Sequence, residues 1–261
     1  MSSIQTNISS SKNEYAIYGL LSQLFEYPRD NSYKDSIISI FNQLKVELPE
    51  AAESMEVFID FINEATLSEM QELYLRSFDV QAITTLDIGF VLFGEDYKRG
   101  QLLVNLNREH REAENECNTE LADSLPNVLN LLAKMKNNEM RCEIAEKLVI
   151  PAVVKMASEF SSEKIEKKDE IYKKHLKTLI DFSQKYRIVY QSLLNSLLDV
   201  LKRDFIYDIN ILNYFKDEKC HDDKESCSCE TSAQAEPVSF SNNNYFKDFS
   251  EQIEIEMIIE K

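Results

Sequence analysis

Thiol and imidazole side chains that could bind a metal ion gather near the end of the sequence. The four candidate ligands are Cys220, His221, Cys227 and Cys229. Three thiolates and one imidazole could surround a zinc ion tetrahedrally, and soft ligands of this kind also suit copper(I). The spacing matches no common zinc finger, and the alternative is a flexible segment with reduced thiols. The sequence leaves both interpretations open.

A second group of special residue types runs from Leu92 to Leu103, LFGEDYKRGQLL. It contains two of the four glycines of the chain, four charged residues and aromatic side chains within twelve positions. An amphipathic helical pattern follows it directly. Such a segment, without a catalytic constellation around it, is typical of a recognition site. We therefore expect a binding protein.

The residues that would support catalysis are scarce. The sequence has no phosphate-binding glycine loop, no G-x-S-x-G and no H-E-x-x-H, and its only histidines are His110, His175 and His221. His110 and His175 lie in helical, charged surroundings, which favours a solvated or helix-capping role over a catalytic one. The sequence therefore predicts that the protein is not an enzyme.

Composition indicates the fold that must position these residues. Four glycines and five prolines among 261 residues leave little material for hairpin turns, and 43% of the residues are hydrophobic. Helix-forming residues dominate the rest. We predict an all-α fold, with a single globular domain of about eight helices and a flexible C-terminal tail.

The net charge of −17 limits the class of partner. It would repel nucleic acid and anionic membranes and would attract a basic polypeptide, although acidity can also serve solubility alone. No positively charged start precedes an apolar run, and the longest apolar stretch, 148–154, is too short to cross a bilayer. A cytoplasmic location is the expectation.

The chain divides into four parts by composition. Residues 1–14 read as a flexible N-terminus, 15–215 as the helical domain, 216–244 as a polar tail containing cysteine, and 245–261 as a short docking segment. Within the domain, residues 171–204 carry one long apolar stripe and predict the longest helix.

Local signals predict several helix boundaries. Thr66 and Glu69 have the spacing of a capping box. Gly89 indicates close approach of another backbone, and Gly94 should end that short helix. The next helix should carry Glu95 and Asp96 in its first turn and run to about Glu116. Asp123 or Ser124 could cap a later helix, and Pro151 should bend another.

Three short motifs follow one another in the middle of the chain. They are ELY with FD at 72–79, LFGEDYKRG at 92–100 and ELADSLP at 120–126. In this order they resemble the NarJ and TorD/DmsD group of molybdoenzyme assembly chaperones, nearest the NarJ branch, over about residues 15–205. Ser124 stands where that group usually has histidine.

This resemblance implies a cytoplasmic, non-catalytic chaperone without a cofactor of its own. Its partner would be the apo catalytic subunit of a molybdopterin oxidoreductase, such as a nitrate reductase-like enzyme. The chaperone would hold that subunit until bis-molybdopterin guanine dinucleotide is inserted. The residues expected to bind the client peptide are Phe93, Glu95, Asp96, Tyr97, Arg99, Gly100, Glu120, Leu121, Asp123 and Leu125.

Two other functions stay open from the residues alone. The chain could be an acidic helical scaffold for an unrelated basic protein. It could also deliver a metal through the segment from Cys220 to Cys229.

Overall fold

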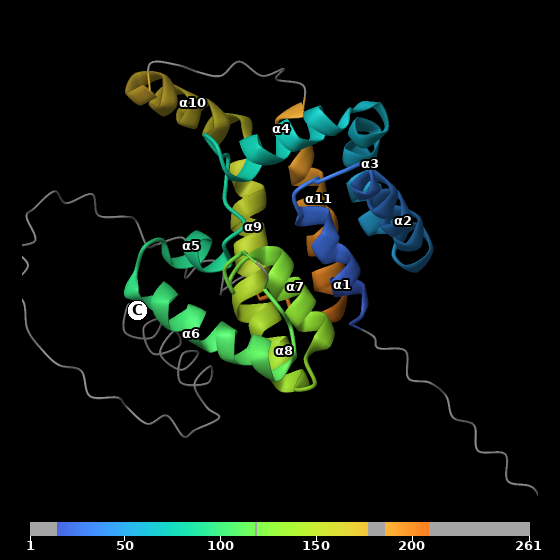
Figure 1. Ribbon diagram of the computed structural model, residues 1–261, viewed down its shortest axis with the longest axis vertical. Helices are drawn as coiled ribbons and strands as arrows, with labels where there is room; N and C mark the ends of the chain where they lie inside the picture. The colour runs from blue at the N-terminus through green and yellow to red at the C-terminus, as the bar shows by residue number, and fades with distance from the viewer. Residues whose placement is uncertain (1–14, 118, 177–185, 209–261) are drawn as a thin grey trace, which may run out of the picture. The chain divides into compact units, whose positions relative to one another are not determined.

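The secondary structure of this protein is helical. The computed structural model describes residues 15–117, 119–176 and 186–208 (Figure 1). The α-helices in these residues are α1 (Ile17–Leu21), α2 (Ser32–Glu47), α3 (Pro49–Glu64), α4 (Leu67–Phe78), α5 (Ile88–Phe93), α6 (Tyr97–Glu112), α7 (Leu125–Lys134), α8 (Asn138–Ile144), α9 (Ile150–Glu159), α10 (Ser162–Leu176) and α11 (Val189–Asp204). A 3₁₀ turn at Ser22–Phe25 and a π-helical stretch at Ala145–Val149 complete the set.

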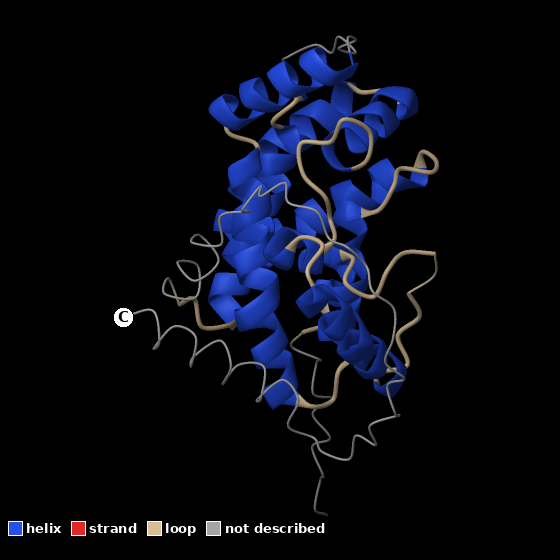
Figure 2. Ribbon diagram, turned by 90° about the vertical axis from the view of Figure 1, so that its left-hand side faces the viewer, coloured by secondary structure: helices blue, strands red, loops and turns tan. Residues whose placement is uncertain are grey.

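The all-α prediction is confirmed for these residues. Figure 2 shows helices and loops and no strand in the coloured part of the chain. The one β-type contact in the described residues is an isolated bridge between Asp87 and Ser124. Within the same residues, no helix combines the length and the apolar composition needed to cross a bilayer. The predicted flexible N-terminus 1–14, the predicted polar tail 216–244 and the predicted docking segment 245–261 lie outside the described residues.

The core is centred on the contact of α11 with α3. Tyr190 on α11 is buried, and its ring lies 4.7 Å from that of Phe78 and 5.2 Å from that of Phe58, measured between ring centroids. The apolar stripe that the sequence predicted for this part of the chain is buried in α11, at Leu193, Leu197 and Leu201. Aromatic and aliphatic side chains thus exclude water from the centre of the described residues.

The predicted helix over residues 171–204 is wrong as a single element. Arg187 and Ile188 are not helical, and α11 begins at Val189. Arg187 donates two hydrogen bonds, of 2.5 and 2.8 Å, to the carboxylate of Asp169 on α10. In one straight helix these residues would lie about 27 Å apart along the axis. The ion pair therefore excludes one straight helix through both residues.

Two of the predicted helix signals are confirmed. The hydroxyl of Thr66 accepts from the amide of Glu69 at 3.3 Å, and the Glu69 carboxylate accepts from the amide of Thr66 at 2.8 Å, which completes the capping box of α4. Gly94 ends α5 with a positive φ of 64°. This conformation strains any residue with a Cβ atom, which accounts for glycine there.

The predicted disturbance at Pro151 takes a specific form. Pro151 lies in the first turn of α9, and the preceding residues Ala145–Val149 form the π-helical stretch. Proline has no N–H and its ring crowds the carbonyl four residues earlier, so a regular helix cannot continue through it. The wider π turn lets α8 pass into α9 without a loop.

The core contact between α3 and α11 leads to a matched prediction on α3. Phe58→Ala removes a buried ring and should lower the free energy of unfolding by about 3–5 kcal/mol. Val57→Ala on the same helix, where the side chain is 55% exposed, should change it by less than about 0.5 kcal/mol. Urea denaturation followed by circular dichroism measures both values.

Candidate functional site

The start of α5 is joined to the start of α7 by backbone pairing. The amide of Ile88 donates to the carbonyl of Asp123 at 2.9 Å, and the amide of Leu125 donates to the carbonyl of Leu86 at 2.9 Å. Between them lies the bridge of Asp87 with Ser124. Two segments far apart in sequence are therefore held in fixed register.

Arg99 on α6 ties this pairing to a third element. Its Nε donates to Oδ2 of Asp123 at 3.1 Å, and its Nη2 donates to Oδ2 of Asp87 at 2.9 Å. The guanidinium also lies 5.4 Å from the ring centroid of Phe90. One side chain thus connects α6 to the residues that precede α5 and α7.

Gly89 makes room for this ion pair. Oδ2 of Asp123 also accepts from the amide of Gly89 at 3.2 Å. A Cβ atom at Gly89 would lie 2.7 Å from that oxygen and 3.1 Å from Cγ of Arg99. We expected another backbone to approach this glycine, and the structure instead places three side chains against it, those of Asp123, Arg99 and Leu102.

The electrostatic balance keeps Arg99 charged. Burial alone would lower the pKa of its guanidinium, but the hydrogen bonds and charges of Asp123 and Asp87 outweigh burial and raise it. Burial raises the pKa of the Asp87 carboxyl, the charge of Asp123 adds to this rise, and Arg99 opposes it. Oδ1 of the fully buried Asp123 has no hydrogen-bond partner among the described residues.

A buried polar network fixes the residues before α7. Nε2 of His110 lies 2.9 Å from the carbonyl oxygen of Ala122, and its Nδ1 lies 2.9 Å from Nδ2 of Asn115. Nδ2 in the side chain of Asn127 donates to the backbone carbonyl of Leu121 at 2.9 Å. The predicted solvated or capping role of His110 is wrong, because its side chain is buried inside this network. The side chain of His175 lies outside the described residues.

The predicted client-binding residues divide by exposure. Phe93, Asp123 and Leu125 are buried, so none of these side chains faces solvent. The Arg99 side chain, which is 18% exposed, is mostly buried and paired with Asp123. The exposed members are Glu95, Asp96, Tyr97, Gly100, Glu120 and Leu121. The predicted residues therefore form two groups. The buried and mostly buried ones, Phe93, Arg99, Asp123 and Leu125, are called the frame, and the others face solvent.

Asp96 also has a local structural role. It is the N-cap of α6, where its carboxylate accepts from the amide of Lys98 at 2.8 Å, and it is not part of the first turn. The same helix ends at Glu112, earlier than the expected Glu116. Ser124 is the N-cap residue of α7 but makes no side-chain capping bond.

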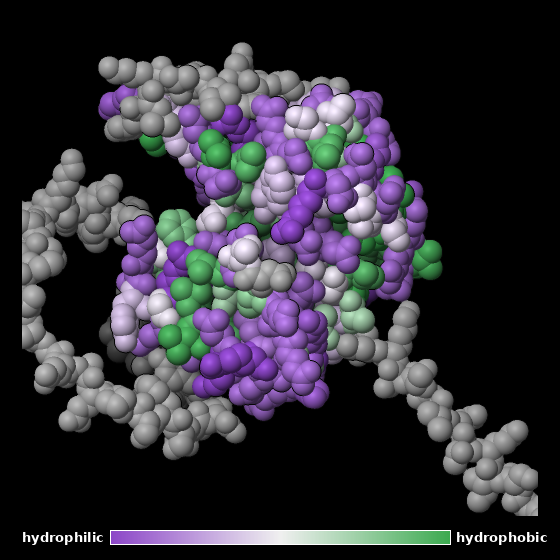
Figure 3. Space-filling view, viewed as in Figure 1, coloured by the Kyte–Doolittle hydropathy of each residue, from purple (hydrophilic) through white to green (hydrophobic). Residues whose placement is uncertain are grey.

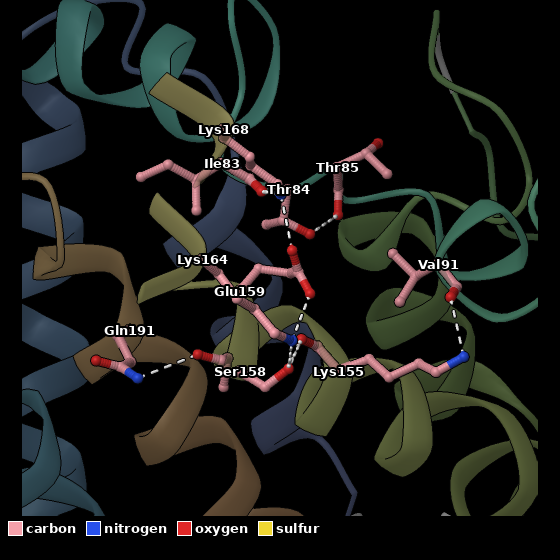
Figure 4. Close-up of polar contacts among 11 residues, drawn as sticks. Ile83, Thr84, Thr85, Val91, Lys155, Ser158, Glu159, Lys164, Lys168 and Gln191 are labelled. Atoms are coloured by element: carbon pink, nitrogen blue, oxygen red, sulfur yellow. Dashed lines mark hydrogen bonds and ion pairs between the residues drawn. The ribbon is translucent and has the colours of Figure 1, made fainter. Parts of the chain in front are cut away.

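Polar side chains of α9 and α10 hold the segment that leads into α5. Lys168 donates to the carbonyl of Ile83 and to the carboxylate of Glu159, and Lys164 donates to Glu159 at 2.7 Å (Figure 4). Lys155 reaches the carbonyl of Val91 at 3.5 Å. Sequence reasoning missed these supports, because lysines of a charged helix carry no signal for a distant backbone carbonyl.

Sequence reasoning also missed Asp87. This residue precedes an apolar helix and reads as an ordinary N-cap, yet its carboxylate binds Arg99, twelve positions later. The signal available was the pattern Asp-x-Gly ahead of a short apolar run, which is too common to identify a site.

The described residues do not include the predicted metal site. They contain no group of three His, Cys, Asp or Glu residues that could hold a metal ion. The candidate ligands Cys220, His221, Cys227 and Cys229 lie outside them. Cys117 and Cys142 are free thiols, and burial raises the pKa of both.

A scan against protein-family models finds no match to this chain. A search of curated proteins finds none either.

The ion pairs of Arg99 predict a large loss of stability when the cation is removed. Arg99→Met keeps most of the aliphatic stem but leaves the Asp123 carboxylate buried without a cation, so the free energy of unfolding should fall by about 3 kcal/mol or more. Arg111→Met, at an exposed position of the same helix, should change it by less than about 0.5 kcal/mol. Adding Asp123→Asn to Arg99→Met should recover part of the loss, whereas additive losses would contradict the pairing.

The His110 network predicts a specific dependence of stability on pH. Burial lowers the pKa of the imidazole and the charge of Lys134 adds to this, although the hydrogen bond with Ala122 opposes it. Below the ordinary value of about 6.5, the unfolded chain then binds more protons than the folded chain. The contribution of His110 to stability should therefore rise from about pH 5 to about pH 7 and be lost as the pH falls.

The measurement is the difference in unfolding free energy between the wild type and His110→Gln across that range. Taking the difference removes the shared contributions of Asp87 and Glu109, whose raised pKa values act in the opposite direction. A difference that stays constant with pH would show that the imidazole does not titrate as described.

Proposed function

We propose that this protein is a cytoplasmic, non-catalytic chaperone that binds the apo catalytic subunit of a molybdopterin oxidoreductase. The bound segment is the N-terminal part of that subunit, and the complex persists until the molybdenum cofactor is inserted. A nitrate reductase-like enzyme is the nearest candidate client, because the motifs at 92–100 and 120–126 resemble the NarJ branch of these chaperones.

One observation carries the proposal: exposed apolar side chains stand next to a rigid, buried ion-paired frame. Tyr97 is 78% exposed and lies two residues before Arg99, and Leu121 is 50% exposed and lies two residues before Asp123. Because Arg99 and Asp123 are bonded to each other, both apolar side chains project from backbone that is already fixed. Preorganised apolar anchors of this kind favour binding of a peptide.

Charge around these anchors favours a basic client segment. Glu95, Asp96 and Glu120 are exposed beside Tyr97 and Leu121. Carboxylates at the rim of an apolar contact steer a peptide containing Arg or Lys and reject an acidic one. The net charge of −17 acts in the same direction.

Binding alone is sufficient for such a protein to act. A chaperone that binds the apo form of its client stabilises that form by mass action, in proportion to its free concentration over the dissociation constant. No nucleotide and no covalent step enters this scheme. Release follows when the client, after receiving its cofactor, folds the recognised segment into its own structure.

A matched pair of double variants tests the proposal. Glu120→Lys with Leu121→Ser should weaken binding of the client's N-terminal peptide about tenfold or more, since it removes an apolar anchor and reverses a charge. Glu56→Lys with Val57→Ser makes the same chemical change at an equally exposed place on α3 and should leave affinity unchanged. Fluorescence anisotropy with a labelled peptide measures both, and equal affinities for the two variants would overturn the proposed site.

A further inference from the structure

Gly100 has no internal reason to be glycine. It lies within α6, is exposed, and a Cβ atom built on it would meet nothing within 4 Å. Glycine inside a helix costs about 1 kcal/mol of stability relative to alanine. Since no packing among the described residues explains this cost, the open space at Gly100 points to a surface that approaches from outside the described residues.

The helix face around Gly100 is apolar in its first half. Tyr97 and Val104 lie three and four residues to either side of it, on the same face, and are 78% and 69% exposed. Figure 3 shows hydrophobic residues gathered over α5 and α6, with hydrophilic ones bordering them. Such a face, left open in a helix that buries its opposite side, marks an interaction surface.

Charge changes sign from the start of α6 to its end. Glu95 and Asp96 precede the helix, and Arg111 lies near its end on the stripe that carries Val104. The acidic end and the basic end are separated by the apolar stretch. A helix with this pattern is complementary to itself when two copies lie antiparallel.

We infer that the α6 face pairs with the α6 face of a second copy of this chain, antiparallel across a two-fold axis. The positions agree closely on one centre: Gly100 with Val104 has its midpoint at residue 102, and Glu95 with Arg111 has its midpoint at 103. A difference of one residue is about 1.5 Å along a helix. One axis therefore satisfies the apolar contact and the Glu95–Arg111 contact.

The apolar contact explains Gly100. In this arrangement Val104 of each copy enters the gap left by the absent side chain of Gly100 in the other copy, and the two-fold axis makes the contact twice. Small residues let helices approach closely, which increases the area of the apolar contact. Phe90 on α5, which is 41% exposed and lies against Arg99 of α6, is a further apolar side chain beside this contact.

The pairing would also regulate the client site, a consequence that rests on the proposed function. Tyr97 belongs both to the α6 face and to the proposed peptide-binding surface. A paired chain would therefore bind client weakly, and client would dissociate the pair. Because the net charge of each copy is −17, the two copies repel each other at long range, so the association should strengthen with moderate salt, which screens this repulsion.

Charge-swapped variants of the full chain test the pairing by sedimentation equilibrium. Glu95→Arg alone and Arg111→Glu alone should each weaken self-association about tenfold, because each places like charges together at both ends. An equimolar mixture of the two variants should recover association, since each unlike pair then contains one acidic and one basic residue at both ends. Arg111 is preferred to Arg108, which is bonded to the buried Glu109.

A glycine variant and a control complete the test. Gly100→Leu fills the gap, so it should weaken association while raising the stability of the helix, which separates loss of pairing from loss of folding. Glu56→Arg, exposed on α3, should leave association unchanged. Photo-crosslinking from position 104 should join two copies, identified with isotopically labelled and unlabelled chains.

The outcomes separate this inference from the proposed function. A wild-type chain that stays monomeric up to about 1 mM, a mixture that fails to recover association, or a crosslink from position 104 to its own chain would each overturn the pairing. Glu120→Lys with Leu121→Ser leaves α6 unchanged, so loss of client binding in that variant, with self-association retained, supports the client site alone. Self-association without any client binding by the wild type would overturn the proposed function and leave the pairing standing.

Discussion

The buried contact of Arg99 with Asp123 is the constraint on which the candidate site depends. Asp123 has no exposure to solvent, and a carboxylate in that position is tolerated because a guanidinium and the amide of Gly89 hold it. Since Arg99 comes from α6 and Asp123 from the residues before α7, their bond fixes the relative positions of two elements. The secondary structure of α6 and of the residues before α7 does not by itself require this relative position. The ion pair thus stabilises a particular arrangement of surface, in addition to the fold.

The frame and the surface use different residues of the same motifs. In the segment 92–100, Phe93 and Arg99 point inward, whereas Glu95, Tyr97 and Gly100 face outward. In 120–126 the same division separates Asp123 and Leu125 from Glu120 and Leu121. The backbone that carries the exposed residues is therefore held from beneath by buried side chains. A surface held in this way loses less entropy when it binds a ligand.

Local rules in the sequence predicted the helices well where one residue decides the outcome. The capping box at Thr66 and the end of α5 at Gly94 depend on neighbouring residues, so spacing alone identified them. The helix over 171–204 failed because the apolar spacing continues across Arg187 and Ile188, which are not helical. Arg187 pairs with Asp169, and periodicity contains no information about that ion pair. His110 was misjudged for a related reason, since its buried partners, Asn115 and Ala122, come from the loop that follows α6.

The sequence by itself determined the all-helical class, the helix ends that a capping residue or glycine sets, and which short segments carry special residues. These properties follow from propensity, capping and hydrophobic periodicity, which act over a few residues. Only the tertiary structure decided which special residues are buried and that Asp87 joins Arg99 and Asp123. It also decided that side chains fill the space beside Gly89, whereas the space beside Gly100 is open. The physical reason is that burial and ion pairing are set by residues distant in the chain, and a charged or small residue looks the same in sequence whether it faces the core or the solvent.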